Sequence, residues 1–310
     1  FSPSYPTDGS TSPGLNITGT AGNDSLQGGF GDDWIEGLAG NDTINGGVGN
    51  DVVYGGQGDD RITGGFGNDM LFGGAGDDSL TDDQGLNVLD GGDGNDYLSG
   101  ASLTLNQTML GGAGDDQLNA TGKVVVADGG EGNDRLNAYG AMNNGYVKNG
   151  AANLTGGSGN DSLYVGRYST ATLEGGEGAD YLNASETRST SLSGGAGDDN
   201  LNENIDPWAT NETDGSYRVN KTATLDGGDG NDTLNLWGYN YIGYGETTVS
   251  LAGGSGNDSL TARDDYAGQQ NTENYYGIAR ATLDGGAGDD VLSAGGVVDL
   301  AMTGGSGSDR

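Results

Sequence analysis

Aspartate recurs at a fixed place in the sequence between Gly19 and Thr81. This stretch consists of seven consecutive nonapeptides, each with an aspartate in the sixth place and an aliphatic residue in the eighth. The unit from Gly64 to Phe72, Gly-Gly-Phe-Gly-Asn-Asp-Met-Leu-Phe, is a clear example. A unit this short cannot bury its own aliphatic side chain, so it must stack on copies of itself to make a core. The period therefore predicts a solenoid whose carboxylates lie in register.

The expected coil contains two nonapeptides, each made of one short strand and one glycine-rich turn. Aspartates 18 residues apart then lie above one another on the same edge, and aspartates 9 residues apart lie on opposite edges. The first column is predicted to contain Asp24, Asp42, Asp60, Asp78, Asp96, Asp116, Asp134, Asp161, Asp180, Asp199, Asp232, Asp258, Asp290 and Asp309. The second column is predicted to contain Asp33, Asp51 and Asp69, and it stops where Asn87 replaces the next aspartate.

The spacing within the first column predicts where the coils carry insertions. Intervals of 18 to 20 residues fit plain coils, and intervals of 26 to 33 residues require extra chain. The extra residues fall after the motif strand and before a return strand, which places them on the edge opposite the first column. The interval of 27 residues before Asp161 equals three nonapeptides, so a switch of the column to the other edge is the alternative. We expect an insertion, because residues 138–153 contain no glycine–aspartate motif.

The predicted core is thin, and glycine supplies the turns around it. Glycine in the first, second and fourth places of the motif permits positive φ values and close approach of the backbone. One apolar ladder comes from the motif strands, with Leu98, Leu118, Leu136, Leu163, Leu182, Leu201, Leu234, Leu260 and Leu292. The other comes from the return strands, with Leu154, Leu173, Leu192, Leu225, Leu251 and Leu283. Backbone ladders and a bound metal must supply the remaining stability.

The composition shows that a counter-charge is needed. The chain has 66 glycines, 32% hydrophobic residues and a formal net charge of -35, which without a period would predict disorder. Carboxylates at this density repel one another, so a compact state requires neutralisation, for which a bound cation is the natural candidate. The negative charge also argues against nucleic acid or an anionic membrane as the partner.

Several classes of protein are disfavoured by what the sequence lacks. It contains no Cys and no His, so the commonest catalytic bases and nucleophiles are missing. It has no Gly-X-Ser-X-Gly elbow and no zinc-protease helix motif. We therefore expect no enzymatic activity. No apolar run is long enough for a membrane span, and the given sequence shows no cleavable secretory signal.

The nonapeptide Gly-Gly-X-Gly-X-Asp-X-apolar-X resembles the repeat of the RTX (repeats-in-toxin) haemolysin-type calcium-binding family. The resemblance covers about residues 19–309 and implies an all-β, right-handed parallel β-roll of about 14 coils. It also implies calcium between successive turns, held by the sixth-place carboxylates of both columns and by turn carbonyls. Thirteen gaps on one edge and two on the other would hold about 15 calcium ions, or about +30 against -35. The motif departs from the family pattern at Thr20, Leu38, Ala179 and Ser308, none of which removes a carboxylate.

Three regions follow from this pattern. Residues 1–18 are expected to form a lead-in and a first strand. Residues 19–81 are expected to form a β-roll with calcium turns on both edges. Residues 82–310 are expected to continue it with calcium turns on one edge and variable aromatic loops on the other.

The aromatic residues assigned to these loops suggest a contact surface. They are Tyr139, Tyr146, Tyr164, Tyr168, Trp208, Tyr217, Trp237, Tyr239, Tyr241, Tyr244, Tyr266, Tyr275 and Tyr276. They either contact a protein or glycan, because rigid amphipathic rings give contact area at low entropic cost, or they fold back over the rim of the narrow core.

The family resemblance and the composition together lead to a functional expectation. We expect a secreted structural or adhesive element of a bacterial surface, matrix or extracellular filament, exported by a type I route. The alternative is a non-catalytic secretion and folding module of a larger exported enzyme, toxin or adhesin. The sequence stops within a motif, which suggests either a piece of a larger protein or coil ends that meet head-to-tail between copies.

Overall fold

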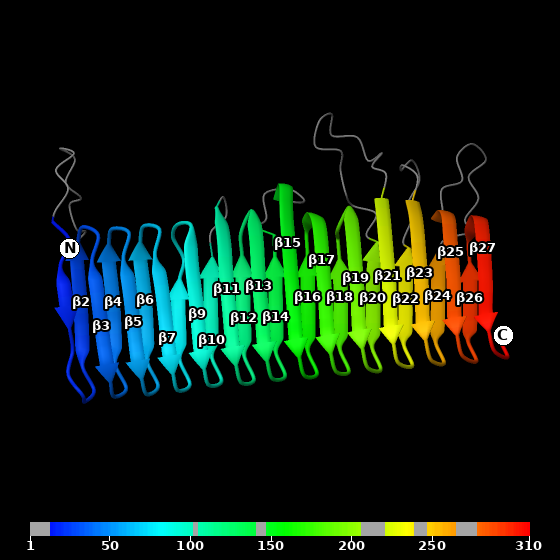
Figure 1. Ribbon diagram of the computed structural model, residues 1–310. Coiled ribbons are helices and arrows are strands. Elements are labelled where there is room, and N and C mark those ends of the chain that lie inside the picture. Colours follow the sequence, from blue (N-terminus) through cyan, green and yellow to red (C-terminus); the bar gives the residue numbers. More distant parts are fainter. Residues whose placement is uncertain (1–12, 102–104, 141–146, 206–220, 239–246, 265–277) are drawn as a thin grey trace.

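The computed structural model describes residues 13–101, 105–140, 147–205, 221–238, 247–264 and 278–310. These residues form 27 β-strands, and no helix occurs among them. Successive strands alternate between two parallel sheets, which lie back to back along an elongated rod (Figure 1). This confirms both the solenoid that the nine-residue period predicts and the all-β parallel β-roll that the family resemblance implies.

The first sheet contains the fourteen odd-numbered strands. Their bounds are β1 (Asn16–Thr18), β3 (Trp34–Ala39), β5 (Val52–Gln57), β7 (Met70–Ala75), β9 (Asn87–Asp93), β11 (Asn106–Ala113), β13 (Val124–Glu131), β15 (Val147–Ser158), β17 (Tyr168–Glu177), β19 (Ser189–Ala196), β21 (Lys221–Asp229), β23 (Thr247–Ser255), β25 (Ile278–Ala287) and β27 (Val297–Ser306).

The second sheet contains the thirteen even-numbered strands. Their bounds are β2 (Ser25–Phe30), β4 (Thr43–Val48), β6 (Arg61–Phe66), β8 (Ser79–Asp82), β10 (Tyr97–Ala101), β12 (Gln117–Thr121), β14 (Arg135–Tyr139), β16 (Ser162–Gly166), β18 (Tyr181–Ser185), β20 (Asn200–Ile205), β22 (Thr233–Gly238), β24 (Ser259–Asp264) and β26 (Val291–Gly295).

The register follows the sequence repeat. Each strand pairs with the strand one coil further on, so that Ile35 pairs with Val53 and Val53 with Leu71. Because the side chains of a strand point alternately to its two faces, this register stacks every eighth-place residue on the core side. The turns from odd to even strands, drawn along the lower side of Figure 1, form the first edge, and the turns from even to odd strands form the second edge.

The structure settles the uncertain interval before Asp161. Strand β14 pairs directly with β16, in a register that places Leu136 beside Leu163. Asp134 and Asp161 both lie in odd-to-even turns, so the first column stays on one edge and the extra residues form an insertion, as expected. The other long intervals also fall between an even and an odd strand, on the second edge.

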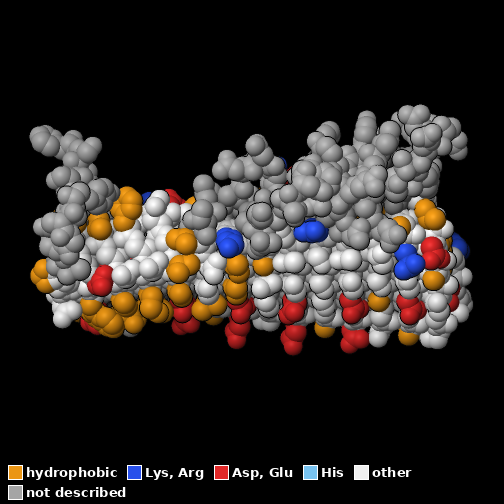
Figure 2. Space-filling view, turned by 90° about the horizontal axis from the view of Figure 1, so that it is seen from above, with side chains coloured by type: hydrophobic (Ala, Val, Ile, Leu, Met, Phe, Trp, Pro, Cys, Tyr) orange, Lys and Arg blue, Asp and Glu red, His pale blue; other side chains and the backbone are white. Residues whose placement is uncertain are grey.

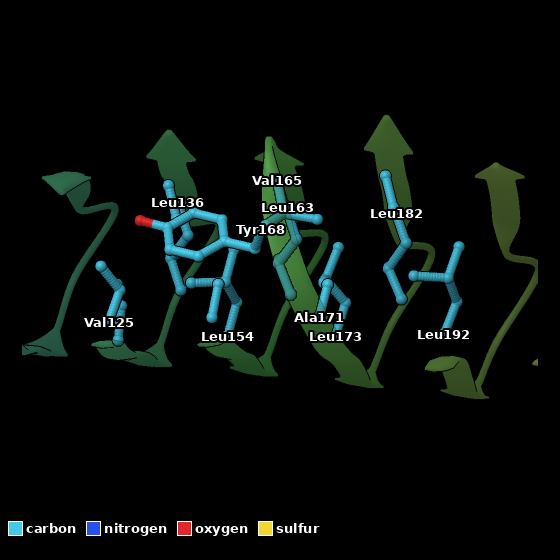
Figure 3. Close-up of a cluster of buried hydrophobic side chains, with 14 of the residues drawn as sticks. Val125, Leu136, Leu154, Leu163, Val165, Tyr168, Ala171, Leu173, Leu182 and Leu192 are labelled. Atoms are coloured by element: carbon cyan, nitrogen blue, oxygen red, sulfur yellow. The ribbon is translucent and has the colours of Figure 1, made fainter. Parts of the chain in front are cut away.

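The two apolar ladders form the core, and the later coils widen it. All the predicted leucines are buried except Leu292, which is partly buried. From β11 onward the odd-numbered strands have 8 to 12 residues, and both sheets add a further inward rung of alanine, valine and leucine, such as Val165, Ala171 and Leu236. Tyr168 is fully buried and lies among aliphatic side chains of both sheets (Figure 3).

The placement of the described aromatic residues in loops was wrong. Tyr139, Tyr164, Tyr168 and Trp237 all lie within strands, because the return strands begin sooner and the motif strands end later than the nonapeptide suggests. Tyr168 agrees with the second alternative, that the rings cover the core, since its own ring is buried within the core. The remaining members lie outside the described residues; they are Tyr146, Trp208, Tyr217, Tyr239, Tyr241, Tyr244, Tyr266, Tyr275 and Tyr276.

Glycine is required where successive turns touch. Gly47 and Gly49 have φ values of 112° and 145°, and a Cβ on either would overlap the backbone of the preceding turn. Leu38, which replaces a second-place glycine, still adopts a φ of 87°. The stacking of the turns therefore imposes a left-handed conformation that L side chains disfavour.

No described segment is a helix long and apolar enough to cross a membrane.

The thin core gives a first prediction. Replacing Leu182, which is 0% exposed, with alanine should lower the free energy of unfolding by about 2–5 kcal/mol, because it removes contacts and leaves a cavity. Leu110→Ala is the matched control, since Leu110 lies on the outer face of β11 and is 37% exposed. Urea unfolding in saturating calcium measures both, and equal losses in the two variants would contradict the assignment of the core.

Candidate metal centre

The aspartates of each column are joined from coil to coil by one of their two carboxylate oxygens. The amide of Asp42 donates to Oδ1 of Asp60 at 2.7 Å, and the amide of Asp60 donates to Oδ1 of Asp78 at 2.7 Å. The same bond joins every successive pair of the first column, ending with the amide of Asp290 and Oδ1 of Asp309 at 3.2 Å. Both predicted columns therefore exist as continuous stacks, the second joining Asp33, Asp51 and Asp69 at 2.8 Å.

The other carboxylate oxygen is buried without a hydrogen-bond partner. Among the described residues this is true of Oδ2 in all three aspartates of the second column and in twelve of the first, from Asp42 to Asp290. Unpartnered buried oxygen atoms are rare, because burying a polar group without a partner is costly. A whole column of them indicates a ligand that the oxygens share.

A small space beside the first glycine of the motif faces each of these oxygens, and we call this space a cradle. A Cβ placed on Gly46, the first residue of its motif, would lie 2.5 Å from Oδ2 of Asp51 and 2.7 Å from the carbonyl oxygen of Gly64 in the next coil. The carboxylate of one turn and the carbonyl of the next thus converge on one space that only glycine leaves open. The first edge repeats this arrangement from Gly19 to Gly285.

Burial and mutual repulsion raise the pKa values of carboxyls in both columns, among them those of Asp51, Asp78 and Asp116. Burial is the largest cause of the shift, and repulsion from neighbouring aspartates adds to it. Together they raise the pKa of Asp51 to about 6 and the pKa values of Asp78 and Asp116 to about 7. The hydrogen bond from the preceding aspartate's amide acts in the opposite direction and lowers each value. The stacks therefore resist full ionisation unless positive charge enters them.

A second ladder lies on the outside of the turns, and the sequence analysis missed it. The fifth-place amides donate to the fifth-place side chain of the preceding coil, as from Asn133 to Oδ1 of Asp115 at 2.7 Å. Asn133 donates to the same oxygen through Nδ2 at 2.9 Å, and together these bonds lower the pKa of Asp115. The signal was present in the sequence as the recurrence of Asn or Asp before the sixth-place aspartate.

A stack of parallel coils whose glycine turns face buried carboxylates defines a cation-binding β-roll. The chain belongs to the RTX calcium-binding nonapeptide repeat family, whose model matches more than half of it. The matched segments are residues 18–53, 37–71, 45–80, 72–102, 110–140, 147–167, 171–186, 224–238, 250–265 and 281–300. No curated protein matches the chain as a relative. Membership identifies a calcium-binding repeat protein of a kind that is typically secreted.

The cradles fit calcium in the kind of ligand they offer. Calcium takes hard oxygen ligands from carboxylates and backbone carbonyls, and both converge at each cradle. Among the described residues no group of three or more His, Cys, Asp or Glu side chains forms a metal site, so carbonyls must complete the ligand set. The ligand role of each column aspartate, and the number of ions, stay predictions.

The cradle can be tested by filling it. Gly46→Ala should cost about one calcium ion per chain, because the methyl group would occupy the space between Oδ2 of Asp51 and the carbonyl of Gly64. Gly29→Ala is the matched control, because a Cβ at Gly29 would meet nothing within 4 Å. Native mass spectrometry in calcium counts the ions, and an unchanged count in Gly46→Ala would exclude the cradle as the binding site.

The raised pKa values predict an unusual pH dependence for the metal-free chain. These carboxyls have a pKa of about 6 to 7 in the folded state and the ordinary value of 3.8 in the unfolded chain. Between these values the folded state binds more protons than the unfolded state. The metal-free fold should therefore be most stable near pH 4 and lose stability as the pH rises from about 4 to about 7. Circular dichroism of metal-free protein measures this; strand signal that increases with pH would contradict it.

Proposed function

We propose that the protein is a secreted, calcium-dependent structural or adhesive β-roll of a bacterial surface, matrix or extracellular filament. The observation that carries this proposal is the unbroken stack of carboxylates and glycine cradles along the whole first edge. Because the ligands come from successive coils, binding an ion also joins those coils, and binding free energy becomes folding free energy. Extracellular calcium modules work at about 10⁻⁴ to 10⁻³ M, so such a chain would fold after export.

We further infer that these residues do not catalyse a reaction. RTX repeats are in general calcium-binding repeats rather than catalytic units. The sixth-place carboxylates, the most numerous buried acidic groups described here, face cradles between coils. A cation held there would leave them unable to exchange protons with a substrate.

The outer face of the first sheet supports the adhesive part of the proposal. Trp34, Tyr54 and Phe72 form a ring ladder, with centroids 5.2 and 4.7 Å apart and the last pair stacked. Hydrophobic side chains gather on one side of the rod over the N-terminal coils, and acidic side chains follow along the same side (Figure 2). On the outer face of the first sheet, Trp34 and Met70 are 42% and 43% exposed. A flat apolar face with rigid rings suits contact with a protein, a glycan or a second copy of the chain.

Calcium-dependent formation of a rod tests the proposed function. In millimolar calcium, small-angle X-ray scattering should show an elongated particle and circular dichroism should show strand structure. In EGTA with magnesium, the scattering profile and the circular dichroism spectrum should become those of an expanded, disordered chain. Magnesium should not replace calcium, because it prefers a smaller octahedral site. A rod of unchanged length and strand content in EGTA would overturn the proposal.

A further inference from the structure

The turn between β8 and β9 departs from the motif at three positions on the second edge. Asp82 occupies the first place, where glycine stands in all the other motif turns, Asp83 occupies the second place, and Asn87 occupies the sixth place, where aspartate is expected. The turn nevertheless keeps its place in the stack. The amide of Val88 donates to the carbonyl of Asp69 at 3.0 Å, and Gly85 has a φ of 120°.

Asp82 turns its carboxylate inward rather than to solvent. Its side chain is 1% exposed, and its Oδ1 accepts a hydrogen bond from the amide of Gln84 at 3.0 Å. Its Oδ2 is buried and faces the buried Oδ2 of Asp69 in the preceding coil, and neither oxygen has a hydrogen-bond partner beyond the other carboxyl. Two buried carboxylate oxygens thus face each other in one gap, with no donor from the rest of the protein.

These two oxygens converge on a cradle of the same kind as the others. A Cβ on Gly64 would meet Oδ2 of Asp82 and lie 2.7 Å from Oδ2 of Asp69. In the cradle of the preceding coil, at Gly46, the next coil contributes the carbonyl oxygen of Gly64 in the corresponding position. At Gly64, therefore, a carboxylate oxygen of the next coil lies nearer than any carbonyl oxygen.

The departures at Asp82 and Asn87 compensate each other in charge. An ordinary gap on this edge lies between two sixth-place carboxylates, as between Asp51 and Asp69. In the last gap the neutral Asn87 still accepts the amide of Asp69 through Oδ1 at 3.0 Å, so it keeps the hydrogen bond and gives up the charge. Asp82 restores the missing carboxylate from the other end of the same turn. Two facing carboxylates with no basic group at the cradle need positive charge between them, either a shared proton or a bound cation.

We propose that Asp69 and Asp82 hold a third divalent cation on the second edge, beyond the gaps that the motif aspartates alone define. This inference rests on the proposed calcium-dependent role and extends it to a turn that lacks the motif. The site is the last on its edge among the described residues, because Gln107 and then Val125 follow Asn87 in the same column. The predicted total becomes about 16 calcium ions, each gap holding one.

Anomalous diffraction from crystals grown in calcium tests the site directly. The proposal expects a calcium peak between the carboxylates of Asp69 and Asp82, as well as peaks in the ordinary cradles. Peaks in the ordinary cradles with none here would overturn this inference alone, and would indicate that the two carboxyls share a proton. No peak in any cradle would contradict the proposed function as well.

A matched pair of variants gives an independent measurement on the full chain. Asp82→Asn should bind one calcium ion fewer than the wild-type protein by native mass spectrometry. Asp83→Asn removes the same charge from an exposed neighbour and should leave the count unchanged. Equal counts in the wild-type protein and Asp82→Asn would overturn the proposal. If Asp82→Asn fails to fold, as judged by circular dichroism, the diffraction result decides.

Discussion

The structure depends on how each stacked aspartate uses its two carboxylate oxygens. One oxygen accepts the backbone amide of the preceding coil and fixes the register, and the other enters the gap toward the next coil. Burial makes this arrangement unfavourable for a bare negative charge, as the raised pKa values of Asp78 and Asp116 show. The fold therefore needs positive charge in the gaps. Calcium is the natural source of that charge, because the chain belongs to a calcium-binding repeat family.

The two edges of the rod offset the conformational entropy lost on folding in different ways, one with stacked carboxylates and the other increasingly with apolar burial. On the second edge the column passes from Asp69 to Asn87 and Gln107, and then to Val125 and alanine. Carboxylates give way to neutral amides and then to a second apolar rung, so hydrophobic burial takes over where the carboxylates end. The first edge keeps its carboxylates throughout, and this leaves the second edge free to carry insertions.

A strict period makes most of this fold predictable from sequence. The spacing of the aspartates fixed both columns and the register, and the absence of a motif in residues 138–153 correctly indicated an insertion. Side chains outside the motif were not predictable, because their environment depends on residues one coil away. Tyr168 and Glu203 are examples: both are buried, and burial raises the pKa of Glu203 to about 8. The inward carboxylate of Asp82 was missed for the same reason, since its turn reads as a degenerate repeat.

Hydrogen exchange of the turn amides, measured at neutral pH with and without calcium, tests the central claim most directly. The amides of the sixth-place aspartates donate only across gaps between coils, so their protection reports whether the stack is joined. We predict slow exchange along the whole first edge in calcium and fast exchange in chelator. Equal protection in both conditions would show that the carboxylate stack holds together without the cation, and would contradict the account.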